Sequence, residues 1–256
     1  LQFIGTSVFA QYVLSSERLN TWIQVNIGWG LAITFASIPV AKLSGAHLNP
    51  AISLMMWTFG DLSFIQFTLY SIIQTFGAFF GAATTYIVYY DAINEFDGGN
   101  RTALGLTGTA NIFITFPATY LSVSGAYIDQ LIGTGFFALS FAAITDKRSK
   151  IPVWVHPILF GLVYTLIGTS LGMNVGYPIN PARDFGPRIF TLFIYGTEVF
   201  TYPYLSWFLI PIIAPLSGAI LFGWSYYLFS GMHIPDDDVL FDDISYPRFH
   251  YTYATV

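Results

Sequence analysis

The tripeptide Asn-Pro-Ala occurs twice in this chain and is its clearest indication of a functional site. The two copies are Asn49-Pro50-Ala51 and Asn180-Pro181-Ala182, and each follows a glycine-containing stretch and precedes an apolar run. Asn is a preferred helix N-cap, and Pro suits the first helical position because the N–H that it lacks would have no partner there. Each copy therefore predicts the start of a helix.

The pairing of the two copies carries more information than either one. Matched polar breaks in the two halves of a membrane chain are typical of a site near the membrane midplane. Two helices that begin there would each present about half a positive charge, which repels cations, including hydronium. We expect Asn49 and Asn180 to keep amide N–H donors free for a passing solute oxygen. One copy alone would be explained by an ordinary helix start in a loop, but two copies in matched contexts favour a channel.

The composition predicts an integral membrane protein. Of the 256 residues, 54% are hydrophobic and 9% are charged, whereas about 25% are charged in soluble domains, and the mean hydropathy is +0.60. No basic surface is available for nucleic acid, and the absence of cysteine excludes disulfides and thiolate metal sites. No set of acid, base and nucleophile is visible, so we expect neither an enzyme nor a cofactor. Five acidic residues gather near the end of the chain, at Asp236, Asp237, Asp238, Asp242 and Asp243.

Charges and turn residues divide the chain into six expected spans of an all-α membrane protein. The candidate spans are residues 1–14, 18–42, 61–91, 129–146, 151–173 and 202–232. The runs after Asn49 and Asn180 are too short for the about 20 residues of a span, so we interpret them as re-entrant half-helices. The first span is also short, because sixteen uncharged residues cover only about 24 Å of a core about 30 Å thick. We expect one domain over 1–231, made of inverted repeats 1–123 and 124–231, and an acidic cytoplasmic tail over 232–256.

The basic residues near the expected span ends predict the orientation. Most of them fall on one side of the six-span arrangement, namely Lys42, Lys147, Arg148, Lys150 and Arg248. The positive-inside rule then places both termini in the cytoplasm, and we expect the plasma membrane. Residues 91–124 would lie outside, where Asn100-Arg101-Thr102 matches an N-glycosylation sequon at Asn100.

Two longer stretches around the tripeptides resemble a known family. Residues 44–51, Ser-Gly-Ala-His-Leu-Asn-Pro-Ala, and residues 176–188, Gly-Tyr-Pro-Ile-Asn-Pro-Ala-Arg-Asp-Phe-Gly-Pro-Arg, look like the signature loops of the major intrinsic proteins, and more narrowly of the aquaglyceroporins. The similarity runs from about Gln2 to Phe229. It implies an inverted-repeat channel of six helices and two half-helices, assembled in the bilayer as a homotetramer with one pore per subunit. The implied solutes are glycerol, water and similar small uncharged molecules.

The same resemblance assigns a selectivity filter to Trp29, Gly168, Tyr177 and Arg183. An arginine in an apolar membrane loop is costly and therefore functional by default. Water channels of the family resemble one another in having His where this chain has Gly168, so the glycine is expected to leave space for a polyol. Trp29 and Tyr177 would contact its carbon backbone while Arg183 donates to its hydroxyls.

The resemblance also implies which groups line and support the pore. The pore-lining carbonyls would be those of Gly45, Ala46, His47, Leu48, Asn174, Val175, Gly176 and Tyr177. Asp184 and Arg188 stand four residues apart on a helix, so we expect an ion pair that braces the loop. Gln2 and Gln130 replace the usual buried Glu of the family; their amides are expected to hold loop carbonyls by donating N–H groups. Amides relay no protons, which argues against a proton-coupled transporter.

Two alternatives remain beside a glycerol channel. One is a water-selective pore, against which Gly168 and Asp184 count. The other is a structural or junctional membrane protein with little transport, which the short first span favours.

Overall fold

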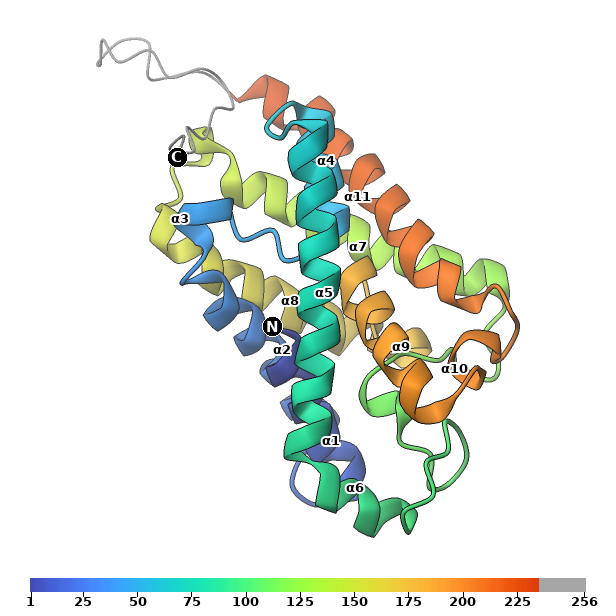
Figure 1. Cartoon of the computed structure of the whole chain (residues 1–256). Coiled ribbons are helices and arrows are strands. Elements are labelled where there is room, and N and C mark those ends of the chain that lie inside the picture. The colour runs from blue at the N-terminus through green and yellow to red at the C-terminus, as the bar shows by residue number, and fades with distance from the viewer. Residues whose placement is uncertain (235–256) are drawn as a thin grey trace.

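The computed structural model describes residues 1–234, and the predicted acidic cluster Asp236–Asp243 lies outside them. Within the described residues all regular elements are helical (Figure 1). The α-helices are α1 (Gln2–Leu14), α2 (Trp22–Ser37), α3 (Ala41–Ser44), α4 (Pro50–Phe59), α5 (Phe64–Val88), α6 (Tyr90–Asp97), α7 (Val123–Thr145), α8 (His156–Val175), α9 (Pro181–Tyr195), α10 (Glu198–Thr201) and α11 (Ile210–Phe229). The all-α fold with apolar helices agrees with the expectation from the sequence.

Four helical segments of the described chain are long and apolar enough to cross a membrane. They are Phe64–Val88, Val123–Thr145, Val153–Val175 and Trp207–His233. Helix α1 has 13 residues and α2 has 16, so α1 rises only about 20 Å at 1.5 Å per residue. The short first span of the sequence is therefore a short helix in the structure.

Helix α7 begins earlier than its expected limit at Asp129. It starts at Val123, so Asp129 lies within the helix. The Asp129 carboxylate accepts hydrogen bonds from Gln130 Nε2 at 2.8 Å and from Asn174 Nδ2 at 2.8 Å. Because both carboxylate oxygens have hydrogen-bond donors, the charge at Asp129 does not end the helix. The span limit that we expected at Asp129 was therefore wrong.

The helix packing has the symmetry of an inverted repeat. Helices α1, α2, α4 and α5 correspond in order to α7, α8, α9 and α11. In the first set α1 packs on α2 and α5, and in the second α7 packs on α8 and α11. Each short helix packs on a long helix of the other set, α4 on α11 and α9 on α5, while α2 and α8 meet at the centre. The two segments that begin with Pro50 and Pro181 are thereby brought face to face.

Glycines bring the two central helices into backbone contact. A Cβ atom built on Gly30 of α2 would lie 2.6 Å from the carbonyl oxygen of Gly161 in α8, and a Cβ on Gly161 would lie 2.5 Å from that of Gly30. Small residues allow such approaches between membrane helices. The crossing fixes the distance between the side chains that α2 and α8 direct toward the centre.

Helix α1 accompanies only the later half of α5. Gln2 packs against Gly81, the Thr6 and Thr85 hydroxyls are 2.6 Å apart, and Gln11 Nε2 donates to the Tyr89 hydroxyl at 3.1 Å. Figure 1 shows the N-terminus about midway along α5. The earlier half of α5 leaves large apolar side chains exposed, including Phe64, Ile65, Leu69, Ile73 and Phe76.

Candidate functional site

The two Asn-Pro-Ala tripeptides start α4 and α9 in the same way. Asn49 and Asn180 are the N-caps, with nearly equal extended backbone angles of φ −154°, ψ 119° and φ −155°, ψ 111°. Asn49 Oδ1 accepts from the Ala51 N–H at 2.9 Å, and Asn180 Oδ1 accepts from the Ala182 N–H at 3.0 Å. Each amide oxygen is thus used to satisfy the first turn of its helix.

The amide nitrogens tie the two loops together. Asn49 Nδ2 donates to the Ile179 carbonyl at 2.9 Å, and Asn180 Nδ2 donates to the Leu48 carbonyl at 2.8 Å. Each acceptor directly precedes the other asparagine in the chain. The sequence interpretation left these donors free, whereas in the structure one N–H of each amide goes to the facing loop. The second N–H of each amide has no acceptor among the described residues.

The loops before the two asparagines share an unusual backbone pattern. Ala46 and Leu48 have φ of 52° and 51°, and the corresponding residues Tyr177 and Ile179 have φ of 44° and 36°. Residues other than glycine rarely adopt this left-handed backbone region, and such strain persists only where the surrounding structure imposes it. The repeated pattern keeps both approaches to the asparagines non-helical.

The non-helical approach leaves several predicted pore carbonyls unpaired. Within the described chain, no hydrogen bond is accepted by the carbonyls of Ala46, His47, Gly176 and Tyr177. Gly45 and Val175 stand at helix C-termini, and their carbonyls likewise accept no hydrogen bond among the described residues. The other two expected carbonyls are paired: Leu48 accepts from Asn180 at 2.8 Å, and Asn174 accepts from the Ala118 N–H at 2.9 Å. Oxygens without protein donors in a membrane core need water or a solute as partner.

The Arg183 guanidinium lies against Trp29, and both are residues of the predicted filter. Arg183 is 5% exposed, and its Cζ lies 4.8 Å from the centre of the Trp29 ring. Such cation–π contacts hold a guanidinium over an indole face. Arg183 Nη1 is buried and has no hydrogen-bond partner among the described residues. The site therefore contains a charged donor that the described protein groups do not satisfy.

Tyr177 occupies the space that Gly168 was expected to leave open. A Cβ atom built on Gly168 would lie 2.6 Å from Tyr177 Cζ and 2.6 Å from Asn26 Oδ1. The Tyr177 hydroxyl donates to Asn26 Oδ1 at 2.5 Å. The glycine therefore accommodates the Tyr177 ring, which is fixed at its hydroxyl by Asn26. The sequence did not single out Asn26, since its role depends on a contact across 151 positions.

Asp184 and Arg188 brace the filter loop from behind. The Asp184 carboxylate receives Arg188 Nε at 2.7 Å and Nη2 at 2.6 Å, together with the Thr115 N–H at 3.0 Å and hydroxyl at 2.6 Å. Arg188 also donates to the Thr115 carbonyl at 2.9 Å and to the Val199 carbonyl. Both charged side chains are buried. The i,i+4 pair thus fixes the segment around Thr115 on α9. No local sequence pattern predicted Thr115 as a partner of this pair.

The two expected glutamine supports differ from each other. Gln130 Oε1 accepts from the Ile179 N–H at 2.9 Å, so it holds the loop through a backbone N–H, not through a carbonyl as expected. Gln2 is 5% exposed, and neither its Oε1 nor its Nε2 has a partner among the described residues. Only the second loop therefore has its glutamine support. In the first loop, Ser53 is within 3.2 Å of His47 Nδ1 and accepts from Gln74 Nε2 at 3.1 Å.

Three cavities lie beside the two loops. A vestibule of about 380 Å³ is lined by residues between 103 and 118, residues 172–176, Phe9, Trp22 and Arg183. A central cavity of about 10 Å³ borders both asparagines. A third, of about 30 Å³, contains His47 and continues from the central one through shared residues such as Phe160. No group of three or more His, Cys, Asp or Glu that could hold a metal ion occurs in the part of the chain that the structure describes.

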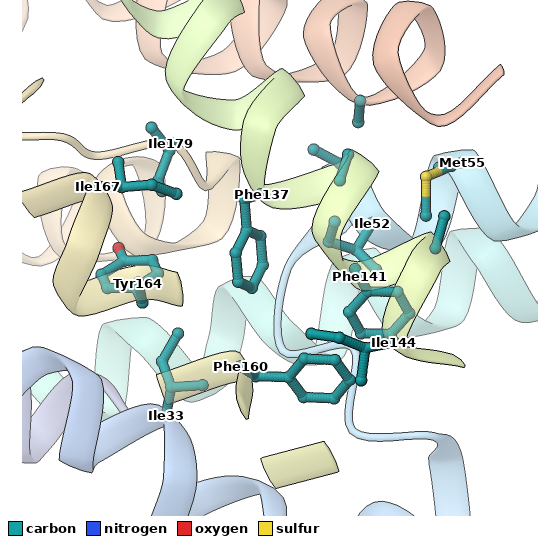
Figure 2. Packing of buried hydrophobic residues seen from close by; sticks show 14 of the residues in the cluster. Ile33, Ile52, Met55, Phe137, Phe141, Ile144, Phe160, Tyr164, Ile167 and Ile179 are labelled. Carbon is teal, nitrogen blue, oxygen red and sulfur yellow. The ribbon is translucent and has the colours of Figure 1, made fainter. Parts of the chain in front are cut away.

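One aromatic residue of the central cavity is absent from the sequence expectations. Tyr164 of α8 is 2% exposed and lines this cavity with Ile33, Phe137 and both asparagines. Figure 2 shows its ring near Ile33 and Phe137, with the hydroxyl oxygen directed toward Ile167 and Ile179. Tyr164 precedes Gly168 by one helical turn, so helical spacing from the filter glycine was the available signal.

Comparisons with known proteins agree with this geometry. The family model described as major intrinsic protein matches residues 1–226. Aquaporin-10 of Homo sapiens is 38% identical over 238 residues, which cover 92% of this chain and 79% of that protein. Aquaporin-9 of Mus musculus is 42% identical over 92% of this chain and 80% of its own length, and aquaglyceroporin-2 of Rhizophagus irregularis is 39% identical over 87% and 71%. The X-ray structure of the aquaglyceroporin from Plasmodium falciparum superposes with a TM-score of 0.81 at 28% identity, covering 90% of this chain and 92% of that chain.

Proposed function

Because the chain belongs to the major intrinsic protein family, we propose that it is a passive channel for glycerol and similar small uncharged solutes, with water. The observation that carries the proposal is the pair of asparagine-capped helix starts joined by reciprocal hydrogen bonds. Relatives named aquaporin and aquaglyceroporin support the same solutes. The proposal assigns passive conduction and no catalytic step.

Ion and proton exclusion follows from the charges at the site. The N-termini of α4 and α9 each contribute about half a positive charge at one point. The buried Arg183 guanidinium adds a full charge beside Trp29. A cation loses its water in this passage without finding a negative group to replace it, whereas a neutral solute meets only hydrogen-bond partners. The remaining amide N–H groups, Arg183 Nη1 and the unpaired loop carbonyls supply donors and acceptors in turn.

The surroundings of the channel belong to the same proposal. It forms a homotetramer in the plasma membrane, with cytoplasmic termini and the tail over residues 232–256 inside. The end that carries residues 98–122 then faces outward, where Asn100 is exposed and follows the turn at Gly98 and Gly99. This position is accessible to a glycosylating enzyme. A single channel domain over 1–231, in two repeats, is consistent with the paired helix contacts.

A water-selective channel is the second candidate. It is favoured by the Tyr177 ring over Gly168, which narrows the filter relative to the open space expected from the sequence. The two candidates differ in the solute that passes, and flux measurements separate them.

The test is stopped-flow light scattering of proteoliposomes under glycerol and mannitol gradients. We expect glycerol flux above that of protein-free vesicles, and lower glycerol flux with cation leakage in Arg183→Ala. Phe136→Leu serves as the control, because Phe136 lies on the outer face of α7 and is 40% exposed. Water flux without glycerol flux would favour the water-selective candidate, and loss of both in the wild type would refute a channel.

A histidine at position 168 tests the filter assignment. Gly168→His alone would collide with Tyr177 and Asn26, so we pair it with Tyr177→Ala, which removes the ring and releases the Asn26 side chain from the Tyr177 hydroxyl so that it can move aside. The double variant should suppress glycerol flux more than water flux, and Tyr177→Ala alone is its reference. Equal suppression of both fluxes would contradict the assignment.

A further inference from the structure

We propose that Tyr164 is a further specificity-determining residue, whose ring closes the passage between the filter and the asparagine pair to solutes larger than water until it moves aside. The inference rests on the proposed channel function and adds a second constriction to it. The sequence resemblance assigned no role to this residue.

The position of Tyr164 follows from the geometry of α8. This helix runs from the cavity that contains His156 toward the vestibule, which its last residues line. Tyr164 precedes Gly168 by four residues, or about 6 Å along the axis at 1.5 Å per residue. It therefore lies one turn inside the filter and on the same helix face. Its neighbours in the central cavity are Asn49 and Asn180, so it stands between the filter and the asparagines.

Three other rings surround Tyr164 and complete a collar. The Tyr164 ring centre lies 6.3 Å from that of Trp29, 5.7 Å from that of Tyr177 and 5.8 Å from that of Phe137. The last two contacts are edge-to-face, with interplanar angles of 69° and 88°. Such contacts are within the range of favourable aromatic pairs. We call these four side chains the aromatic collar.

The aromatic collar separates the two cavities. The vestibule and the central cavity have no lining residue in common. The central cavity measures about 10 Å³, which is about the space that one water molecule needs. Glycerol is several times larger than water, so its passage requires the collar to open further than it does in this arrangement.

Two members of the collar are held by polar or ionic contacts, and Tyr164 is not one of them. Trp29 is held under the Arg183 guanidinium, and Tyr177 is held at its hydroxyl by Asn26. No hydrogen bond is made by the Tyr164 hydroxyl to any of the described residues, and Phe137 has no polar group to hold it. Turning Trp29 or Tyr177 therefore breaks a polar or ionic contact, whereas turning Tyr164 or Phe137 breaks ring contacts only. Of these two, Tyr164 contacts the filter rings Trp29 and Tyr177, while Phe137 reaches the collar only through Tyr164, so opening toward the filter takes place at Tyr164.

The experiment compares two substitutions of Tyr164 in proteoliposomes. Tyr164→Leu removes the ring, so the ratio of glycerol to water permeability should rise about fivefold, which corresponds to about 1 kcal/mol of barrier. The variant should also admit erythritol, which is one carbon longer than glycerol. Tyr164→Phe keeps the ring, so its permeability ratio should stay at the wild-type value and erythritol should stay excluded. Phe136→Leu is the matched ring-to-leucine control on the outer face of α7.

The outcomes separate this inference from the proposed function. An unchanged ratio in Tyr164→Leu, or a raised ratio in Tyr164→Phe, overturns the inference and leaves the channel function intact. A wild type without glycerol flux and a Tyr164→Leu variant that conducts glycerol would support the inference but overturn glycerol as the native solute. If neither protein conducts, both are overturned. Should Tyr164→Leu fail to fold, Phe137→Leu removes the opposite ring of the collar and must raise the ratio in its place.

Discussion

Replacing Asp184 by Asn should destabilise the protein far more than the same change at Asp97. Both residues pair with an arginine four positions later, Arg188 and Arg101. The side chains of Asp184 and Arg188 are 1% and 0% exposed. Asn keeps the shape of Asp184 and one acceptor for Thr115, but it leaves the Arg188 charge buried without a counter-ion. Removing one partner of a buried pair costs about 3–5 kcal/mol.

The Asp97 pair provides the matched comparison. Arg101 is 13% exposed, and it also donates to the Tyr86 hydroxyl at 3.0 Å and to Asn94 Oδ1 at 2.5 Å. Its charge therefore keeps water and two polar partners when Asp97 loses its charge. The Asp97 side chain is itself 0% exposed, but Arg101 keeps its water and its two polar partners, so the loss should be smaller than the about 3–5 kcal/mol of a fully buried pair. At about 2–4 °C per kcal/mol for a chain of this size, we expect Asp184→Asn to lower the unfolding midpoint by about 6–20 °C and Asp97→Asn by clearly less.

The assay is thermal unfolding of the purified protein in detergent, followed by tryptophan fluorescence. A further variant, Asp184→Asn with Arg188→Met, removes both charges while the Asn keeps an acceptor for Thr115, and it should recover part of the loss because no buried charge is left without a counter-ion. Trp207 Nε1 still donates to the Thr115 carbonyl in that variant, at 3.1 Å. Equal midpoints for Asp184→Asn and Asp97→Asn would refute the argument, and so would a double variant less stable than Asp184→Asn.

Three further predictions use the same measurement. Gln130→Leu leaves the buried Ile179 N–H without its acceptor, so it should lower the free energy of unfolding by about 1–3 kcal/mol. Gln2→Leu removes two unpaired polar atoms and should leave the unfolding midpoint unchanged or raised. Equal losses in the two variants would contradict the difference between the two repeats. Tyr177→Phe deprives Asn26 of its donor and should lower the midpoint by the equivalent of about 1–3 kcal/mol, while no loss would show that Asn26 does not hold the ring. Burial raises the pKa of the Asp146 carboxyl, but hydrogen bonds from Arg148 and the Tyr226 hydroxyl outweigh it, so the pKa lies below its ordinary value of 3.8. The stabilisation that the ionised Asp146 carboxylate provides is present above pH 3.8 and is lost as the pH falls through the lowered pKa. Asp146→Asn should therefore reduce the fall of the unfolding midpoint at acid pH. An unaltered fall would exclude Asp146 as its source.

The pattern of helix starts and spans was readable from local chemistry. An N-cap and a proline act within one turn, so Asn49-Pro50 and Asn180-Pro181 predicted where α4 and α9 begin. Apolar length likewise predicted α5 within three residues at each end and α8 within five, whereas α11 begins eight residues after the expected start at 202. The start of α7 was missed because the Asp129 carboxylate accepts a hydrogen bond from Asn174, a partner 45 positions away.

The use of the side chains at the site depended on the tertiary structure. Gly168 by itself implied open space, and only the folded chain places the Tyr177 ring there. The two glutamines looked equivalent, yet one binds Ile179 and the other has no partner among the described residues. Tyr164 was inconspicuous in an apolar run, since its role arises from rings on α2, α7 and the second loop.

The sequence by itself determined the membrane location, the paired helix starts and the arginine beside them, because hydropathy, capping and charge are properties of neighbouring residues. Only the folded chain shows which amide N–H groups form hydrogen bonds between the two loops, how wide the filter is and where aromatic rings close the passage. These depend on side chains that are distant in the chain and come together only when α2, α8 and the two half-helices pack around one axis.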